Sequence, residues 1–122
     1  MPNPVMHFEI TGKDGKALQE FYGKLFDWHV DANNPMNYGM VDTHDKGING
    51  GISAGDGSGQ QSYVTVYVEV DDTDAYLKKA EAAGGKTIME TTDIPGAVTM
   101  AMFTDPEGHV IGLIKAGSMQ NG

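Results

Sequence analysis

The 122-residue chain has no cysteine, few basic side chains and no long hydrophobic run. Without cysteine it can form no disulfide framework, thiolate nucleophile or thiolate metal site, so it needs no oxidising compartment. Its 17 acidic and 8 basic side chains give a formal net charge of -9. Because phosphate contacts depend on Lys and Arg, nucleic acid and anionic membrane surfaces are not expected partners. A small molecule is the expected partner.

The amino-acid sequence shows neither a targeting segment nor a membrane-spanning segment. The amino terminus has no basic segment followed by an apolar run, and no stretch approaches the roughly 18 to 20 apolar residues of a membrane span. We therefore expect a cytoplasmic protein. The length suits one domain with a proper core and is too short for two independent domains.

The chain nearly repeats itself. Residues 47–52 correspond to residues 108–113, and His7-Phe8-Glu9-Ile10 corresponds to Tyr67-Val68-Glu69-Val70. A unit too small to bury its own sheet face can bury it against a copy, which leaves a cleft for a ligand. We expect a single domain over residues 1–122, built from module one (1–55), a glycine-rich connection (53–61) and module two (62–117).

Each module is predicted to have the order βαβββ. Asp14 and Asp72 are candidate helix caps, and apolar residues alternate or recur at helical spacing in the segments around them. The expected helices run from Asp14 to about Phe26 and from Asp72 to Gly84. The expected strands are 5–10, 28–30, 38–41 and 48–52, followed by 64–70, 87–90, 98–103 and 110–114. The predicted fold class is α+β, with two tandem βαβββ modules (paired ferredoxin-like units) forming a curved mixed sheet around a small-molecule cleft.

Alternation along the first strand of each module assigns the faces of the sheet. In residues 64–70 the valines should pack under the helix, and in residues 5–10 Met6, Phe8 and Ile10 should do the same. The opposite face, which we expect to line the cleft, then carries Val5, His7, Glu9, Thr65, Tyr67 and Glu69.

The order of several motifs resembles the vicinal oxygen chelate superfamily, which includes glyoxalase I, bleomycin and fosfomycin resistance proteins and extradiol dioxygenases. The motifs are His7-Phe8-Glu9-Ile10, Phe21-Tyr22, Leu25-Phe26-Asp27-Trp28 and the closing segment 103–113. The resemblance covers nearly the whole chain. It implies paired βαβββ modules and a homodimer, because members of this family commonly pair.

The resemblance also implies where metal ligands would lie, namely on the first and last strands of each module. The last-strand carboxylate positions are Gly51 and Gly112 here, and the histidine position of module two falls near Thr65. Counting back from Phe21-Tyr22 places His7 at the remaining position, whereas counting back from the end of the strand places Val5 there. Since glycine offers no ligand, we predict no family-type metal site and no cofactor.

Two functional alternatives remain for the acidic residues of the expected cleft. His7, Glu9 and Glu69 could hold a displaced divalent metal such as Mn, Fe, Ni or Zn. Alternatively, two glutamates close together could raise one pKa and act as acid and base, with His7 and Glu69 as catalytic residues. The structural alternative is that both glutamates are solvated at strand ends and that His7 is a hydrogen-bonded structural residue.

Further ligand-binding candidates are aromatic or sulfur-containing. Tyr67 could donate a hydrogen bond to a ligand, Trp28 could stack on a ligand, and four methionines could form a pliable apolar wall. Each of these residues could equally belong to the hydrophobic core, and Trp28 could join the helix to the sheet. The methionines in question are Met36, Met40, Met100 and Met102. We interpret His29, His44 and His109 as surface residues, and glycines 50, 51 and 112 as widening the pocket.

These observations favour a glyoxalase or bleomycin-resistance-like protein that binds a small organic molecule between its modules without a metal. The alternative is a metal-dependent or acid–base lyase or isomerase that uses His7 with Glu9 or Glu69, so whether the protein is an enzyme stays open. A regulatory or scaffold protein is the third possibility.

Overall fold

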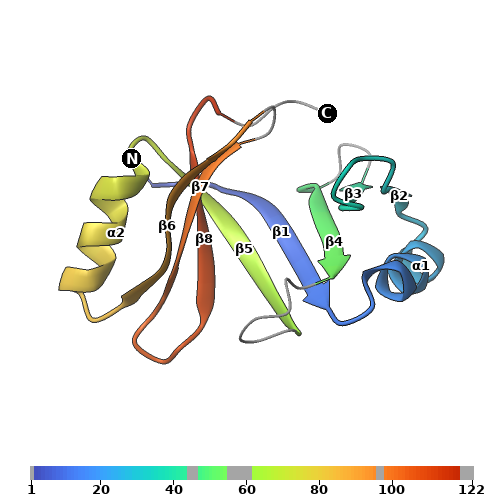
Figure 1. Ribbon diagram of the computed structural model, residues 1–122, viewed down its shortest axis with the longest axis horizontal. Coiled ribbons are helices and arrows are strands. Elements are labelled where there is room, and N and C mark those ends of the chain that lie inside the picture. Colours follow the sequence, from blue (N-terminus) through green and yellow to red (C-terminus); the bar gives the residue numbers. More distant parts are fainter. Residues whose placement is uncertain (1, 44–46, 55–61, 96–97, 119–122) are drawn as a thin grey trace. The chain divides into compact units, whose positions relative to one another are not determined.

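A computed structural model describes residues 2–43, 47–54, 62–95 and 98–118 of the chain (Figure 1). The order βαβββ occurs twice along it, which confirms the predicted α+β class with two βαβββ modules. The elements are β1 (Val5–Gly12), α1 (Gly15–Phe26), β2 (His29–Asp31), β3 (Gly39–Asp42), β4 (Gly50–Ala54), β5 (Tyr63–Val70), α2 (Thr73–Ala82), β6 (Lys86–Ile94), β7 (Val98–Thr104) and β8 (Val110–Lys115).

The chain divides into two compact units. The first unit is Met6–Thr65, and the second unit is Met1–Val5 together with Val66–Gly122. Their sheets have the same topology, with strand orders β2-β3-β4-β1 and β6-β7-β8-β5. In each sheet the module's first strand runs parallel to its last strand, and the other pairs are antiparallel. The predicted single domain with a cleft between modules stays a prediction, and residues 55–61 of the predicted connection lie outside the described residues.

The helices begin where the sequence predicts them. The side chains of Asp14 and Asp72 accept hydrogen bonds from the backbone N–H groups of Ala17 and Ala75, at 3.0 and 3.1 Å, and so cap α1 and α2. Asp27 adopts a left-handed conformation (φ 57°) directly after α1. The strands also agree with the prediction to within a few residues. The largest difference is β6, which continues to Ile94 because it pairs with β7 along that length.

The second unit has a core on both faces of its sheet. Val70, Leu77, Ala101 and Leu113 form the cluster on the α2 side, and Tyr67, Met100, Met102 and Ile114 form a separate cluster. The predicted alternation is thus confirmed for Val70 and Tyr67. It is wrong for Val64, which is 69% exposed. The reason is that β5 pairs with β8 only from Tyr67 onward, so Val64 precedes the part of the strand that this sheet and α2 cover.

The first unit buries Val41 and Ile52 and has an aromatic cluster around the partly buried Trp28. The Trp28 ring lies 5.1 Å from that of Phe26, 5.4 Å from that of Phe8 and 6.0 Å from that of Tyr22, measured between centroids. These contacts join α1 to β1, which confirms that Trp28 connects helix to sheet. A role for Trp28 in ligand binding stays a prediction.

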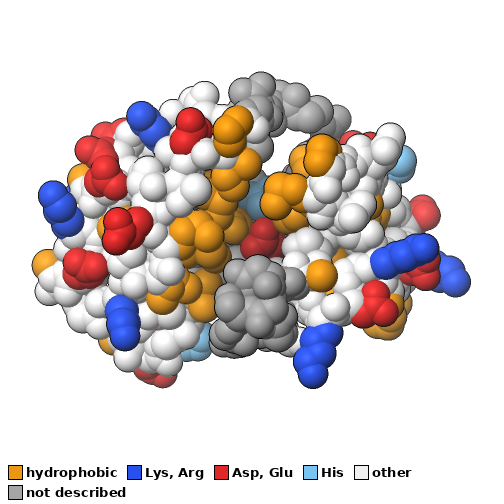
Figure 2. Space-filling view, viewed as in Figure 1, with side chains coloured by type: hydrophobic (Ala, Val, Ile, Leu, Met, Phe, Trp, Pro, Cys, Tyr) orange, Lys and Arg blue, Asp and Glu red, His pale blue; other side chains and the backbone are white. Residues whose placement is uncertain are grey.

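The surface shown in Figure 2 carries scattered charges and no concentrated basic patch. Hydrophobic side chains, drawn in orange, gather in the region where Figure 1 draws β6, β7 and β8. No helix in the described part of the chain is both long and apolar enough to cross a membrane.

Candidate functional site

The segment before β3 places Tyr38 over the sheet of the first unit. The backbone N–H of Tyr38 donates to Asn34 Oδ1 at 2.9 Å, and Asn34 Nδ2 donates to the Tyr38 carbonyl at 2.7 Å. Asn37, between them, has a left-handed backbone conformation (φ 54°), which asparagine tolerates better than most residues. A single asparagine side chain therefore fixes the position of the tyrosine.

The Tyr38 hydroxyl joins His7 to Glu9. It donates to Glu9 Oε2 at 3.0 Å and lies 2.9 Å from His7 Nε2. Because its own proton is directed to Glu9, the hydroxyl accepts the hydrogen bond from His7, which assigns the imidazole proton to Nε2. The His7 and Tyr38 rings are also stacked, with an interplanar angle of 17°. We call His7, Tyr38 and Glu9 the polar triad.

Burial makes His7 a neutral imidazole at pH 7. Loss of hydration in its half-buried position lowers the pKa of His7 from 6.5 to about 4. The polar triad therefore joins a neutral imidazole, whose Nε2–H donates to the Tyr38 hydroxyl, to a carboxylate that accepts from that hydroxyl. Such an arrangement can orient a polar ligand or pass a proton along the hydroxyl.

The glycines expected to widen a pocket are instead covered by aromatic rings. A Cβ atom added to Gly51 would overlap the Tyr38 hydroxyl, and one added to Gly112 would overlap the Tyr67 ring. A Cβ atom at Gly50 would lie 2.5 Å from the Phe8 ring. The expectation of a widened pocket at glycines 50, 51 and 112 is therefore wrong, because large neighbouring side chains occupy the space that these residues leave.

The register of the two sheets corrects the equivalence between the modules. Glu9 pairs with Gly51, and Tyr67 pairs with Gly112. The helix caps give the same offset, since Asp14 follows His7 by as many positions as Asp72 follows Thr65. His7 is thus equivalent to Thr65 and Glu9 to Tyr67, so the sequence match of His7-Phe8-Glu9-Ile10 with Tyr67-Val68-Glu69-Val70 is displaced by two residues. This favours the count that places His7, and not Val5, at the family's ligand position.

The residues present do not fit the metal set that the resemblance implies. Of the four positions, His7 offers a nitrogen, Thr65 a buried hydroxyl, and Gly51 and Gly112 offer nothing. The tyrosines over the two glycines fill the space from which carboxylates would reach a metal. Among the described residues there is also no group of three or more His, Cys, Asp or Glu side chains arranged to hold a metal ion.

The remaining predicted site residues belong to the second unit. Glu69 is half-buried. Its backbone N–H donates to the carbonyl of Pro4 at 2.9 Å, and its carbonyl accepts from the side-chain amide of Asn3 at 3.1 Å. Tyr67, Met100 and Met102 are buried in the core of that unit. The predicted set of His7, Glu9 and Glu69 stays a prediction, and so does ligand binding by the tyrosine and the two methionines.

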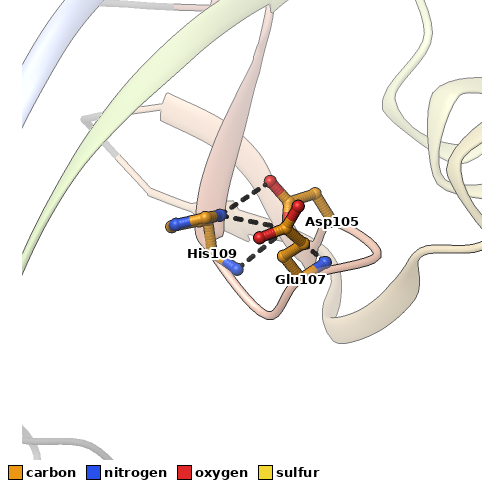
Figure 3. A network of polar contacts seen from close by, with 3 residues as sticks. All are labelled: Asp105, Glu107 and His109. Carbon is orange, nitrogen blue, oxygen red and sulfur yellow. Dashed lines mark hydrogen bonds and ion pairs between the residues drawn. The ribbon is translucent and has the colours of Figure 1, made fainter.

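Histidine 109 belongs to a turn and not to the polar triad. Figure 3 shows Asp105 accepting hydrogen bonds from the backbone N–H groups of Glu107 and His109, at 2.9 and 3.0 Å, while His109 Nδ1 lies 3.0 Å from Asp105 Oδ2. The backbone N–H of His109 is the main cause that lowers the pKa of Asp105. His109 and His29 are exposed, as predicted. His44 lies outside the described residues.

Sequence reasoning missed Tyr38 as a site residue, because its neighbours Met36 and Met40 suggested only an apolar wall. The available signal was Gly51, since a glycine inside a strand marks a close approach by another group. Met40 pairs with Gly51 across β3 and β4, and alternation along β3 then puts Tyr38 on the face where Gly51 has no side chain.

Residues 5–113 match the model of the Glyoxalase/Bleomycin resistance protein/Dioxygenase superfamily. The "Anthracycline biosynthesis protein DnrV" of Streptomyces peucetius is 28% identical over 137 residues, which cover 98% of this chain and 49% of the relative. The "Putative glyoxylase CFP32" of Mycobacterium tuberculosis (strain CDC 1551 / Oshkosh) is 34% identical over 115 residues, which cover 88% and 44%. The chain thus spans about half the length of these curated relatives.

A solved structure shows the same fold at low sequence identity. A Streptomyces coelicolor methylmalonyl-CoA epimerase in complex with 2-nitronate-propionyl-CoA matches with a TM-score of 0.60 and 14% identity, over 99% of this chain and 100% of that chain. At this identity the likeness shows the fold alone.

Proposed function

Because the chain belongs to the Glyoxalase/Bleomycin resistance protein/Dioxygenase superfamily, we propose that it binds a small organic molecule at the polar triad, without the family's metal ligands. One observation carries this proposal. The Tyr38 hydroxyl bonds both His7 and Glu9 directly above Gly51, where a metal-binding relative would have a carboxylate. Polar groups held in place by mutual hydrogen bonds in this way can fix the orientation of a ligand.

The surroundings of the polar triad favour a flat and partly apolar ligand. Met40 shares its face of the sheet with Tyr38, and both Met40 and Met36 are exposed. Exposed methionines next to stacked rings offer a pliable apolar surface to an aromatic molecule. The names of the relatives agree with a small organic ligand, since one is an anthracycline biosynthesis protein and the epimerase structure holds a CoA ester.

An anthracycline is a suitable first probe, because its rings are flat and its fluorescence changes on binding. Titration should give saturable binding to the wild type. Tyr38→Phe should weaken the affinity about fivefold, the effect of losing about 1 kcal/mol from one hydrogen bond. Tyr76→Phe, in the second unit, is the matched control and should bind as the wild type does. Equal affinity of both variants would contradict a role for the polar triad, and absence of saturable binding would contradict the flat aromatic class.

Metal content tests the metal-free part of the proposal. Elemental analysis of the purified protein, before and after chelator, should find no stoichiometric Mn, Fe, Ni or Zn, and adding these ions should leave the melting temperature unchanged. A ligand that binds the native state must raise that temperature by mass action. Stoichiometric metal with a clear upward shift would transfer the proposal to a metal-dependent enzyme centred on His7, Glu9 and Glu69.

The continuous hydrogen bonds of the polar triad favour acid–base chemistry as a second candidate function. A proton can pass between His7 and Glu9 through the Tyr38 hydroxyl without movement of the backbone. An isomerase or lyase of this kind should lose turnover of a glutathione hemithioacetal, the glyoxalase-type substrate, in His7→Ala and Glu9→Gln. A binding protein should show only a modest loss of affinity in the same variants, and a scaffold no change.

Two further expectations accompany the proposed function. We expect a cytoplasmic protein that has a small molecule, and neither nucleic acid nor membrane, as its partner. We also expect a homodimer.

A further inference from the structure

Helix α2 covers only part of one face of the sheet in the second unit. It packs mainly against β6 and β7, lies beside β6 in Figure 1, and touches β8 only slightly. On β5 and β8, alternation places Val68 and Ile111 on the same side of the sheet as the buried Val70 and Leu113. Val68 and Ile111 themselves are only half-buried. The α2 side of the sheet is therefore incompletely covered over β5 and β8.

A pocket of about 340 Å³ occupies this part of the face. Apolar side chains line most of it, including Val68, Phe103 and Ile111 of the strands and Ala80 of α2. All of its lining residues belong to the second unit. Small-molecule sites are typically concave and mostly apolar, with volumes of about 300–1,000 Å³ and a few polar groups that orient the ligand. The pocket has the size and the apolar lining of such a site.

The segment before β1 forms one wall of the pocket through Asn3. The Asn3 side-chain amide donates to the Glu69 carbonyl at 3.1 Å, and the Glu69 N–H donates to the Pro4 carbonyl at 2.9 Å. These two bonds hold the segment along β5. Because Glu69 alternates with Val68 along the strand, its carboxylate lies on the opposite face of the sheet and does not line the pocket.

Lys79 is the one charged side chain among the described residues that line the pocket. Its Nζ lies 4.3 Å from the centroid of the Tyr76 ring. Within the part of the chain that the structure describes, Lys79 has no ion-pair partner. The positions three and four residues away from it hold three alanines and Tyr76, so no carboxylate of α2 lies one turn from it. The positive charge of Lys79 is therefore available to a ligand.

The two acidic residues of α2 face β6 and not the pocket. Glu81 Oε2 accepts a hydrogen bond from the Thr87 hydroxyl at 2.6 Å, and Asp74 accepts one from the Thr91 hydroxyl. Both threonines belong to β6. The helix thus directs its carboxylates to one side and Lys79 to the other. An apolar lining with a single cation at its edge complements a ligand that has one anionic group and an apolar body.

We propose that this pocket binds a small organic acid, with the carboxylate beside Lys79 and the apolar ring or chain against Val68 and Ile111. Binding removes apolar surface of both side chains from water, which supplies the main driving force. The site lies on the α2 side of its sheet, whereas the cluster around Tyr67 belongs to the other side and the polar triad belongs to the first unit. The proposed site is therefore separate from the polar triad and does not depend on what the polar triad binds.

Titration of the 122-residue chain with naphthoate, followed by two-dimensional amide NMR spectra, tests the proposal. Naphthoate should shift the amide signals of Val68, Ala80 and Ile111 saturably, with a Kd on the order of 0.1–1 mM for a ligand of this size. Lys79→Met keeps the apolar stem and should weaken this binding about fivefold, which corresponds to the loss of an exposed ion pair of about 1 kcal/mol. Lys78→Met is the matched control, since Lys78 does not line the pocket, and it should bind as the wild type does.

The uncharged naphthamide separates the charge from the apolar contact. The wild type should bind naphthamide about fivefold more weakly than naphthoate, and Lys79→Met should leave the affinity for naphthamide unchanged. Equal effects of Lys78→Met and Lys79→Met on naphthoate binding, or shifts confined to the polar triad, would overturn the proposal.

Filling the pocket gives a test that does not depend on charge. Ala80→Leu places a larger side chain in the pocket, whereas Ala82→Leu adds the same group at an exposed position of α2. Leucine favours a helix nearly as well as alanine does, so both variants should fold, as thermal melting can verify. Ala80→Leu should weaken naphthoate binding about tenfold or more, and Ala82→Leu should leave it unchanged. Undiminished binding to a folded Ala80→Leu variant, or no saturable shift in the wild type, would contradict a site in this pocket.

Discussion

Removal of the Tyr38 hydroxyl should destabilise the first unit measurably. Tyr38→Phe keeps the ring over Gly51 and deletes both the 3.0 Å bond to Glu9 and the 2.9 Å bond to His7. A hydrogen bond to a charged acceptor contributes about 1.5–3 kcal/mol, and a neutral one about 1 kcal/mol. His7 and Glu9 each have further interactions, so neither becomes wholly unsatisfied. We therefore expect a loss of about 2 kcal/mol in the free energy of unfolding.

Urea unfolding followed by tryptophan fluorescence measures this loss in the relevant unit. Trp28 is the only tryptophan of the chain and packs against the rings of Phe8 and Phe26 in the first unit, so its emission reports the unfolding of that unit. With an m-value on the order of 2 kcal/mol/M, the expected loss lowers the midpoint by about 1 M urea. Tyr76→Phe, which deletes a 3.3 Å bond to Asn3 in the second unit, is the control and should leave the midpoint nearly unchanged.

A double-mutant cycle separates the hydrogen bond from other effects of the substitution. Glu9→Ala and Tyr38→Phe should be non-additive by more than about 0.5 kcal/mol, because they remove the acceptor and the donor of the same hydrogen bond. A Tyr38→Phe loss below about 0.5 kcal/mol, or strict additivity with Glu9→Ala, would refute the inference that the hydroxyl connects the polar triad.

Three further predictions concern the same unit. Gly51→Ala should cost more than about 2 kcal/mol because the new methyl group overlaps the Tyr38 hydroxyl, whereas Gly47→Ala, with its nearest neighbour at 3.8 Å, should be close to neutral in the same urea assay. Burial lowers the pKa of His7 to about 4, so below pH 6.5 the unfolded state binds a proton that the folded state does not bind. Stability should therefore fall by up to about 3 kcal/mol between pH 6.5 and 4. The urea midpoint of His7→Gln should lack this part of the pH dependence. Thr11→Val should raise the unfolding free energy by about 1 kcal/mol in calorimetry, since the buried Thr11 hydroxyl has no hydrogen-bond partner among the residues that the structure describes. A decrease would contradict this account.

Local sequence signals predicted the elements of this fold well. Asp14 and Asp72 mark the helix starts because a capping carboxylate acts on the next few residues and needs no tertiary partner. The faces of β5 followed from alternation at Tyr67 and Val70, where β5 pairs with β8. Val64 shows where this reasoning stops, because whether an alternating residue is buried depends on how far the neighbouring strand and helix extend.

The polar triad could be predicted only in part. Alternation placed His7 and Glu9 on one face, since both lie on β1. Tyr38 comes from a segment that precedes β3. Its position depends on the two hydrogen bonds between the Asn34 side chain and the Tyr38 backbone, and on the register of β3 against β4. The sequence match between residues 7–10 and 67–70 was displaced by two residues. This displacement left each side chain on the correct face of its strand, but it paired Glu9 with Glu69 in place of Tyr67. Register is set by long-range pairing, and neither spacing nor composition determines it alone.

The strand registers show which residues of the two units are equivalent, and these equivalent residues differ in their chemistry. Met40 and Met102 pair with Gly51 and Gly112, so Tyr38 is equivalent to Met100, just as Glu9 is equivalent to Tyr67. Each unit therefore covers its last-strand glycine with a tyrosine, but the two tyrosines come from different strands. In the second unit the equivalent positions are occupied by Thr65, Tyr67, Met100 and Met102, all of them buried. In the first unit they are occupied by His7, Glu9, Tyr38 and Met40, which include the groups able to donate, accept and transfer a proton. Substitutions in the first unit should thus change ligand affinity or turnover, and equivalent substitutions in the second unit should act mainly on stability.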